Sequence, residues 1–338
     1  MTGPVGLSLS LGPSPVGGAS SPSISGVAYP GETLTVSGGS GDIQWRVDGD
    51  AVTGETGSTY VVSVNDIGKA IDVLQETVVT LPVTCWHPRD EPGVSVVMLA
   101  NKEVYNAIDP EVEATDGQTV RRWVGQTDSP VVLNQSTGAE QPLRQVAEVN
   151  GNDTVQFDGS NDFIGTGSNS IIRNKSWAYL IAACADTNRT GGNDIHAVLH
   201  IGTNFPGAVW IGLNTRAVDN VFRIASRRQF SDSISSATAP SADGYHVLTG
   251  ECRWAAGSIR LRVDGETVDS DDAISAGNSQ DSNSAELLIG STGTRPFPGH
   301  VAMALVATPD DEWTPEVRSR IERYAGLLIG KNIPLVEP

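Results

Sequence analysis

Polar and apolar residues alternate in short segments along most of the chain, a pattern typical of β-strands. In Thr154–Phe157 the apolar residues fall on every second position, which predicts a strand with one buried face. The following Asp158–Asp162 combines Gly with Asp, Ser and Asn side chains that bond their own backbone, so we expect the chain to reverse there. Trp177–Ala185 is almost entirely apolar and predicts a central strand covered on both faces.

Turn signals divide the chain into regions. In residues 24–82, turns at Asp48-Gly49 and Gly54–Ser58 separate short alternating segments, which predicts a small antiparallel sandwich. Two prolines in residues 83–93 break any strand ladder, so this segment is expected to be a linker. Residues 94–338 contain many further strands and are expected to form one larger sandwich. Residues 1–23 are rich in Gly, Ser and Pro and form either a flexible arm or, through Gly6–Leu11, a strand added to a neighbour's sheet.

One helix is predicted over residues 314–330. Thr314 is a suitable N-cap, and Pro315 suits the first helical position. Apolar residues then recur at helical spacing, and Gly330 is a suitable terminator.

The smaller region resembles a bacterial immunoglobulin-like repeat. The similarity rests on YPGETLTVSGG, IQWRVDGDAVTGETGSTYVV and VNDIGKAIDV. It implies that Trp45 fills the space between two sheets. Since the cysteines that would join the sheets are missing, burial around Trp45, Val36, Val62 and Val73 has to stabilise this domain.

The larger region resembles the concanavalin A-like (laminin G-like) jelly roll of phage structural proteins and secreted bacterial lectin modules. The similarity rests on the FDGSNDF block, on DGQTVRRWVGQTDS and TGAEQPLRQVAEVNG before it, and on HVAMALVA followed by the helix RIERYAGLLIG. It implies an all-β protein in which a small immunoglobulin-like sandwich precedes a jelly roll with one C-terminal helix.

Composition narrows the range of partners. The 40 acidic and 22 basic residues give a formal charge of -18, which repels phosphate backbones and anionic lipids. No apolar stretch is long enough to cross a bilayer, so we expect neither nucleic-acid binding nor membrane insertion. The N-terminal sequence lacks the features of a secretory signal, which suggests release by cell lysis. Cys184 and Cys252 lie in strand patterns and are expected to be buried thiols.

Catalytic motifs are missing from the sequence. No Glu-x-Asp-x-x-Glu occurs, although laminarinase-like enzymes with this fold carry their carboxylates in that pattern. GxSxG, HExxH and phosphate-loop motifs are also missing. His196 and His200 share a strand face but would lie about 13 Å apart, too far to share a metal. We therefore expect no enzymatic activity.

Calcium is the one cofactor that the sequence suggests. Lectin sandwiches often carry a rim site of carboxylates, and Asp158 and Asp162 could supply such ligands. Asp269, Asp271 and Asp272 form a second candidate cluster. The alternatives are turn hydrogen bonds for the first pair and a solvated loop for the second cluster.

Sugar binding requires an aromatic face and planar polar groups for hydroxyls. Such residues gather at Trp210, Asn214, Arg223, Arg227 and Trp254, with Arg216, Arg228 and Arg253 nearby. The tryptophans could instead be core residues, and the arginines could be a docking patch for an acidic partner.

These features favour a non-enzymatic structural protein of a tailed-bacteriophage virion, exposed as a fibre, spike or decoration. Its N-terminal part would bind other virion proteins and its jelly roll a host surface glycan. Homo-oligomers are expected, because virion appendages adopt the symmetry of the site on the particle to which they attach. A secreted or surface bacterial adhesin and a polysaccharide-cleaving enzyme with an unrecognised site remain as alternatives.

Overall fold

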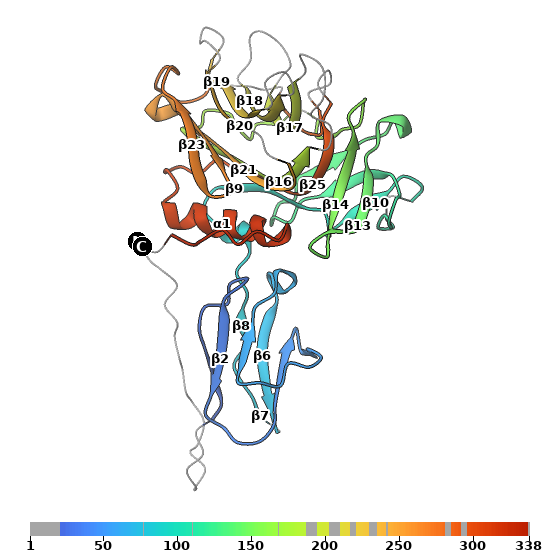
Figure 1. The fold of residues 1–338 in the computed structure, drawn as a ribbon, viewed down its shortest axis with the longest axis vertical. Helices are drawn as coiled ribbons and strands as arrows, with labels where there is room; N and C mark the ends of the chain where they lie inside the picture. The colour runs from blue at the N-terminus through green and yellow to red at the C-terminus, as the bar shows by residue number, and fades with distance from the viewer. Residues whose placement is uncertain are drawn as a thin grey trace. The chain divides into compact units, whose positions relative to one another are not determined.

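The protein is described by a computed structural model. It covers residues 21–336 apart from 77, 110, 168, 187–194, 203–209, 217–220, 230–234, 241–242, 281–284 and 292–295. The chain forms two compact units, Met1–Trp86 and His87–Pro338 (Figure 1). Each unit has its own hydrophobic core.

The first unit consists of two small antiparallel sheets around Trp45. One sheet has the order β1 (Ser23–Ser25), β2 (Thr33–Ser37), β5 (Thr59–Val61). The other contains β4 (Asp50–Ala51), β3 (Ile43–Val47), β6 (Ala70–Gln75) and β7 (Val78–Val79), with β8 (Val83–Thr84) also paired to β6, and η1 (Val64–Asp66) precedes β6. Trp45 is fully buried, stacks on Tyr60 and donates from Nε1 to the Gly57 carbonyl at 2.9 Å. This aromatic centre holds the small core together in the absence of a disulfide among the described residues.

The second unit is a sandwich of two large antiparallel sheets. The nine-stranded sheet has the order β10 (Val104–Asn106), β11 (Val120–Val124), β12 (Val132–Asn134), β15 (Ile164–Gly165), β24 (Glu286–Ile289), β17 (Ile195–Gly202), β18 (Trp210–Arg216), β19 (Val221–Arg227), β20 (Ser235–Pro240). The eight-stranded sheet has the order β13 (Leu143–Val149), β14 (Asn152–Asp158), β25 (Pro298–Ala307), β16 (Trp177–Asp186), β21 (His246–Arg253), β22 (Ser258–Val263), β23 (Glu266–Asp271), and β9 (Val94–Leu99) also pairs with β25. Short 3-10 helices lie at η2 (Pro88–Asp90), η3 (Gly138–Glu140) and η4 (Trp254–Ala256). These sheets confirm the all-β prediction.

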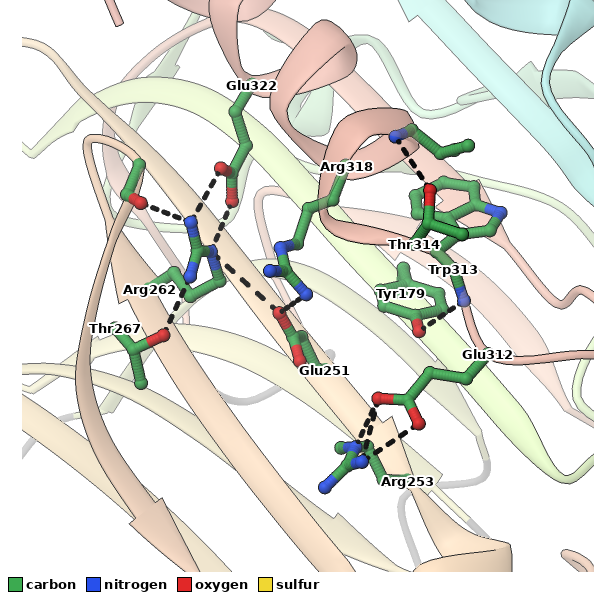
Figure 2. A network of polar contacts seen from close by, with 12 residues as sticks. Tyr179, Glu251, Arg253, Arg262, Thr267, Glu312, Trp313, Thr314, Arg318 and Glu322 are labelled. Atoms are coloured by element: carbon green, nitrogen blue, oxygen red, sulfur yellow. Dashed lines mark hydrogen bonds and ion pairs between the residues drawn. The ribbon is translucent and has the colours of Figure 1, made fainter. Parts of the chain in front are cut away.

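The C-terminal helix α1 (Pro315–Leu328) forms within the predicted limits. Thr314 is its N-cap and accepts a hydrogen bond from the Val317 amide. The helix packs on strands of the eight-stranded sheet, where Trp313 stacks on Tyr179 at 4.4 Å between ring centroids (Figures 1 and 2). Strand β16 is thus covered by the core on one face and by the helix region on the other, and all but its first residue are buried.

Candidate functional site

The strand register brings four of the five predicted sugar-binding positions to one face of the nine-stranded sheet. Trp210 is paired with Arg227, and Asn214 with Arg223. Directly opposed residues of antiparallel strands lie on the same face. The intervening residues of these strands belong to the core, including Ile211, Leu213, Phe222 and Ile224. The four positions therefore share the outer face of the sheet, which we call the β17–β19 face.

The β17–β19 face also includes His200, to which the sequence pattern assigned no binding role. His200 is paired with Gly212 in the register of β17 and β18. A Cβ atom at Gly212 would lie 3.2 Å from Nδ1 of His200 and 3.3 Å from Nδ2 of Asn214. The absent side chain therefore lets the imidazole and the amide converge over the strand. His200 could be recognised as part of this face only once the pairing of β17 and β18, which places it opposite Gly212, is known.

Arg227 and Arg228 have different environments. Arg228 is buried and donates from Nη1 to the Asn278 carbonyl at 3.1 Å. Arg227 is half-buried, and its Nε is shielded from solvent but has no hydrogen-bond partner in the part of the chain that is described. A buried donor without an acceptor costs about 1–3 kcal/mol. The Nε of Arg228 is shielded in the same way, so the two residues differ in that part of the Arg227 side chain remains open to an external acceptor.

Trp254 does not belong to this face, and its predicted role as a sugar contact is wrong. Its side chain is fully buried in the core, and its Nε1 donates to Ser226 Oγ at 3.1 Å. The short 3-10 helix that joins β21 to β22 turns the indole inward. The neighbouring Arg253 is held by both carboxylate oxygens of Glu312, at 2.8 and 2.9 Å (Figure 2).

Asp158 and Asp162 form a hydrogen-bonded turn. Oδ1 of Asp158 accepts from the amides of Ser160 and Asn161 at 2.7 and 3.3 Å, and Oδ2 of Asp162 accepts from the Asp158 amide at 3.0 Å. Burial raises the pKa of Asp162 to about 6. Among the described residues, no three His, Cys, Asp or Glu side chains are placed to hold a metal ion. The geometry thus matches the turn alternative, and calcium at this position remains an untested prediction.

The second acidic cluster protects a sheet edge. Asp269 and Asp271 lie on β23, the last strand of the eight-stranded sheet. Their carboxylates accept from the backbone amides of Thr238 and Ser236 on β20, at 2.7 and 3.0 Å. These charge-assisted hydrogen bonds join the two sheets along their edges. This role differs from both the calcium site and the solvated loop that the sequence suggested.

Two further acidic residues, Glu251 of β21 and Glu322 of α1, are buried where the helix packs on the sheet (Figure 2). Glu322 binds Arg262 through contacts of 2.8 and 3.1 Å, and Glu251 lies 3.0 Å from Nη1 of Arg318. Burial raises the pKa of Glu251, although both arginines act to lower it. Each carboxylate is matched by a guanidinium and buried at the contact of helix and sheet, which is the environment of a structural ion-pair network.

A hollow of about 510 Å³ lies beside the network, between the start of β9 and the connection from β25 to α1. Its walls include Lys175, Asp310, Asp311 and Thr314. Both aspartates are exposed to solvent.

In the described part of the chain, no helix combines the length and apolar character needed to span a membrane. No protein-family model matches the chain, and no curated protein matches it.

Solved structures do show similarity. The CBM40 domain of Ruminococcus gnavus IT-sialidase bound to α2,3-sialyllactose has 14% identity and a TM-score of 0.37, covering 48% of this chain and 91% of that one. The binding domain of botulinum neurotoxin serotype D has 9% identity and a TM-score of 0.45, covering 70% of this chain and 52% of that one. The leech intramolecular trans-sialidase complexed with 2,7-anhydro-Neu5Ac has 14% identity and a TM-score of 0.36, covering 49% of this chain and 26% of that one.

Proposed function

We propose that the protein is a non-enzymatic glycan-binding protein and that the β17–β19 face is its binding surface. The observation that carries this proposal is the strand register, which places the half-buried Arg227 opposite Trp210 and Arg223 opposite Asn214 on one face of the sheet. His200 and Asn214 converge on the same face over Gly212. An imidazole, an amide and a guanidinium together can donate to and accept from the hydroxyl groups of a sugar.

The chemistry of this face supports binding rather than cleavage. Glycoside hydrolysis needs two carboxyl groups on either side of the scissile bond, roughly 5–10 Å apart. Among the described side chains at outward positions of β18 and β19, none is a carboxylate, whereas Asn214, Arg223 and Arg227 are polar or basic. Such a face can hold a saccharide but offers no acid and base pair to hydrolyse it.

The proposal predicts that Trp210→Ala weakens glycan binding. Loss of an aromatic sugar contact should reduce affinity on a glycan array about tenfold, equivalent to about 1.4 kcal/mol. The matched control is Trp177→Ala, which removes a half-buried tryptophan from the other sheet and should leave the array profile unchanged. Equal binding by the wild-type protein and the Trp210 variant, with both folded by circular dichroism, would remove Trp210 from the site.

We further propose that the protein is a structural component of a tailed-bacteriophage virion, exposed on the particle and attached through its N-terminal part. This placement is supported by the resemblance of the larger region of the sequence to the jelly roll of phage structural proteins and by its pairing with a region that resembles an immunoglobulin-like repeat. Mass spectrometry of purified particles should detect the protein, and deletion of residues 1–23 should leave a folded chain that no longer joins them. Absence from the particle would favour a secreted adhesin instead.

A further inference from the structure

We infer that the glycan bound by the β17–β19 face is acidic and that its carboxylate is bound by Arg227. This inference rests on the proposed function and adds the chemical class of the ligand. It starts from the contrast between the charge of the whole protein and the charge of this face.

The protein as a whole repels anions, but the β17–β19 face does not share this character. The formal charge is -18. Side chains are described at these outward positions of β18, β19 and β20, and all of them are basic or uncharged: Gly212, Asn214, Val221, Arg223, Ala225, Arg227, Ser236 and Thr238. An acidic saccharide would therefore be repelled by most of the surface and attracted to this face, which favours binding at one place and in one orientation.

Carboxylates near the face are either distant or already hydrogen-bonded. Glu286 on β24 is exposed and is separated from Arg227 by β17 and β18, a spacing of about 14 Å across the sheet. Asp269 and Asp271 accept hydrogen bonds from the edge of β20. Asp186 lies on β16 of the opposite sheet and binds His196 and Thr215. Thr215 is paired with the core residue Phe222, so this group lies on the inner face of the sheet. None of these described acids is in position to neutralise Arg227.

A carboxylate fits the Arg227 guanidinium better than a neutral hydroxyl does. Guanidinium presents two parallel donors that match the two oxygens of a carboxylate, and the charge roughly doubles the strength of each hydrogen bond. Arg223 lies four residues away along β19, about 13 Å from Arg227, with only Ala225 between them on this face. Arg223 and Arg227 are half-buried, whereas Ala225, Asn214 and His200 are buried, so the two guanidinium side chains are the part of this face most open to a ligand.

Titration with paired saccharides tests this inference. The probes are an oligouronate, the same oligouronate with its carboxylates converted to methyl esters, a sulfated oligosaccharide and a neutral oligosaccharide of similar length. We expect the free oligouronate to bind, its methyl ester to bind at least about tenfold more weakly, and affinity to fall as salt is raised.

Substitution of single arginines identifies the charge that binds the carboxylate. Arg227→Gln should lower affinity for the oligouronate about 10- to 100-fold, because it removes a charge-assisted bond. Arg227→Lys should give an intermediate loss, because it keeps the charge but not the paired donors. Arg122→Gln is the matched control: it removes an arginine from the same face of the sheet, six strands away, where Arg122 lies over the Tyr105 ring at 5.0 Å. It should leave affinity unchanged, and melting curves of all three variants exclude misfolding.

The possible failures can be told apart. Equal binding of the ester and the free acid, or of neutral saccharides through a face insensitive to Arg227→Gln, would overturn the acidic class and leave the proposed function intact. Binding of the sulfated probe alone would also overturn it. Binding of no saccharide, on the probes or on a full array, would overturn the proposed function and this inference together.

Discussion

Arg227 and Arg228 show how much of the site depends on a single step along a strand. Both were candidates from the sequence, since both have the side chain that saccharide binding needs. The register of β18 and β19 places Arg227 opposite Trp210, while Arg228 lies beyond the strand and binds the Asn278 carbonyl. Residue type is visible in the sequence, but the carbonyl that accepts from the Arg228 guanidinium comes from a segment 50 residues away.

Trp254 is a residue that the sequence placed at the site and the structure places in the core. Its neighbour Arg253 is half-buried and bound to Glu312 at the surface of the sheet, whereas the indole fills the core. The reversal arises because the turn after β21 is a turn of 3-10 helix rather than a tight hairpin. Side-chain alternation therefore ends at Arg253, and a strand-based prediction no longer applies at the next residue.

Asp162 provides a pH-dependent test at the residue scale. Burial raises its pKa to about 6 in the folded protein, from an ordinary value of 3.8. The protonated form is therefore favoured by folding: its contribution to stability is complete below about pH 4 and is lost as pH rises through about 6. Asp162→Asn keeps an acceptor oxygen for the Asp158 amide without the buried charge.

The Asn variant should be more stable than the wild type by about 1–2 kcal/mol at pH 8, and the two should become equal near pH 4. Denaturant unfolding at both pH values measures this difference. Asp311→Asn is the control, since this exposed carboxylate should show no such dependence. Lower stability of the Asp162 variant at pH 8 would contradict the raised pKa of Asp162.

At the scale of elements, edge strands explain a group of acids whose role the sequence did not reveal. Strand β20 ends the nine-stranded sheet, and its free amides would be available for pairing with another chain. Asp269 and Asp271 accept from two of these amides. The sequence shows the acidic cluster, but the amides that it caps precede it by about 30 residues, and no local pattern links them.

Removing the Asp269 and Asp271 carboxylates should destabilise the protein and expose the edge of β20. The double variant Asp269→Ala/Asp271→Ala should lose about 2–4 kcal/mol in unfolding free energy, because two backbone donors lose charged acceptors. It should also associate more strongly with increasing concentration, as measured by light scattering. Asp272→Ala removes the exposed neighbouring carboxylate and should change neither property. A double variant as stable and as monodisperse as the wild type would show that the caps contribute nothing.

The helix was the most predictable element, because its cap, its apolar spacing and its terminating glycine are all local signals. Ile321, Tyr324 and Leu328 are buried, as the spacing predicts. Glu322 is also buried, although it lies among charged residues in the sequence. Its burial depends on Arg262, which reaches it from β22 across 60 residues.

At the scale of the whole molecule, the all-β architecture and its closing helix could be predicted, while the partition of strands between sheets could not. Strand β24 lies between β15 and β17, although more than 80 residues separate it from either along the chain. Alternation gives the buried positions of a strand but not its neighbours. The candidate face depends on such neighbours, since His200 joined it only through its pairing with Gly212.

Charge distribution is the whole-molecule property that connects fold to function. A protein with a formal charge of -18 carries Arg223 and Arg227 on one face of its larger sheet, and both side chains are only half-buried. These arginines form a local basic site on an acidic protein, which would attract an anionic ligand. The account therefore depends on a saccharide binding at this place.

The most direct test is a crystal structure of the protein with a bound oligouronate. The account predicts saccharide density over the β17–β19 face, with a carboxylate within hydrogen-bond distance of the Arg227 guanidinium. Density confined to the hollow beside Asp310 and Thr314, with the β17–β19 face empty, would contradict it.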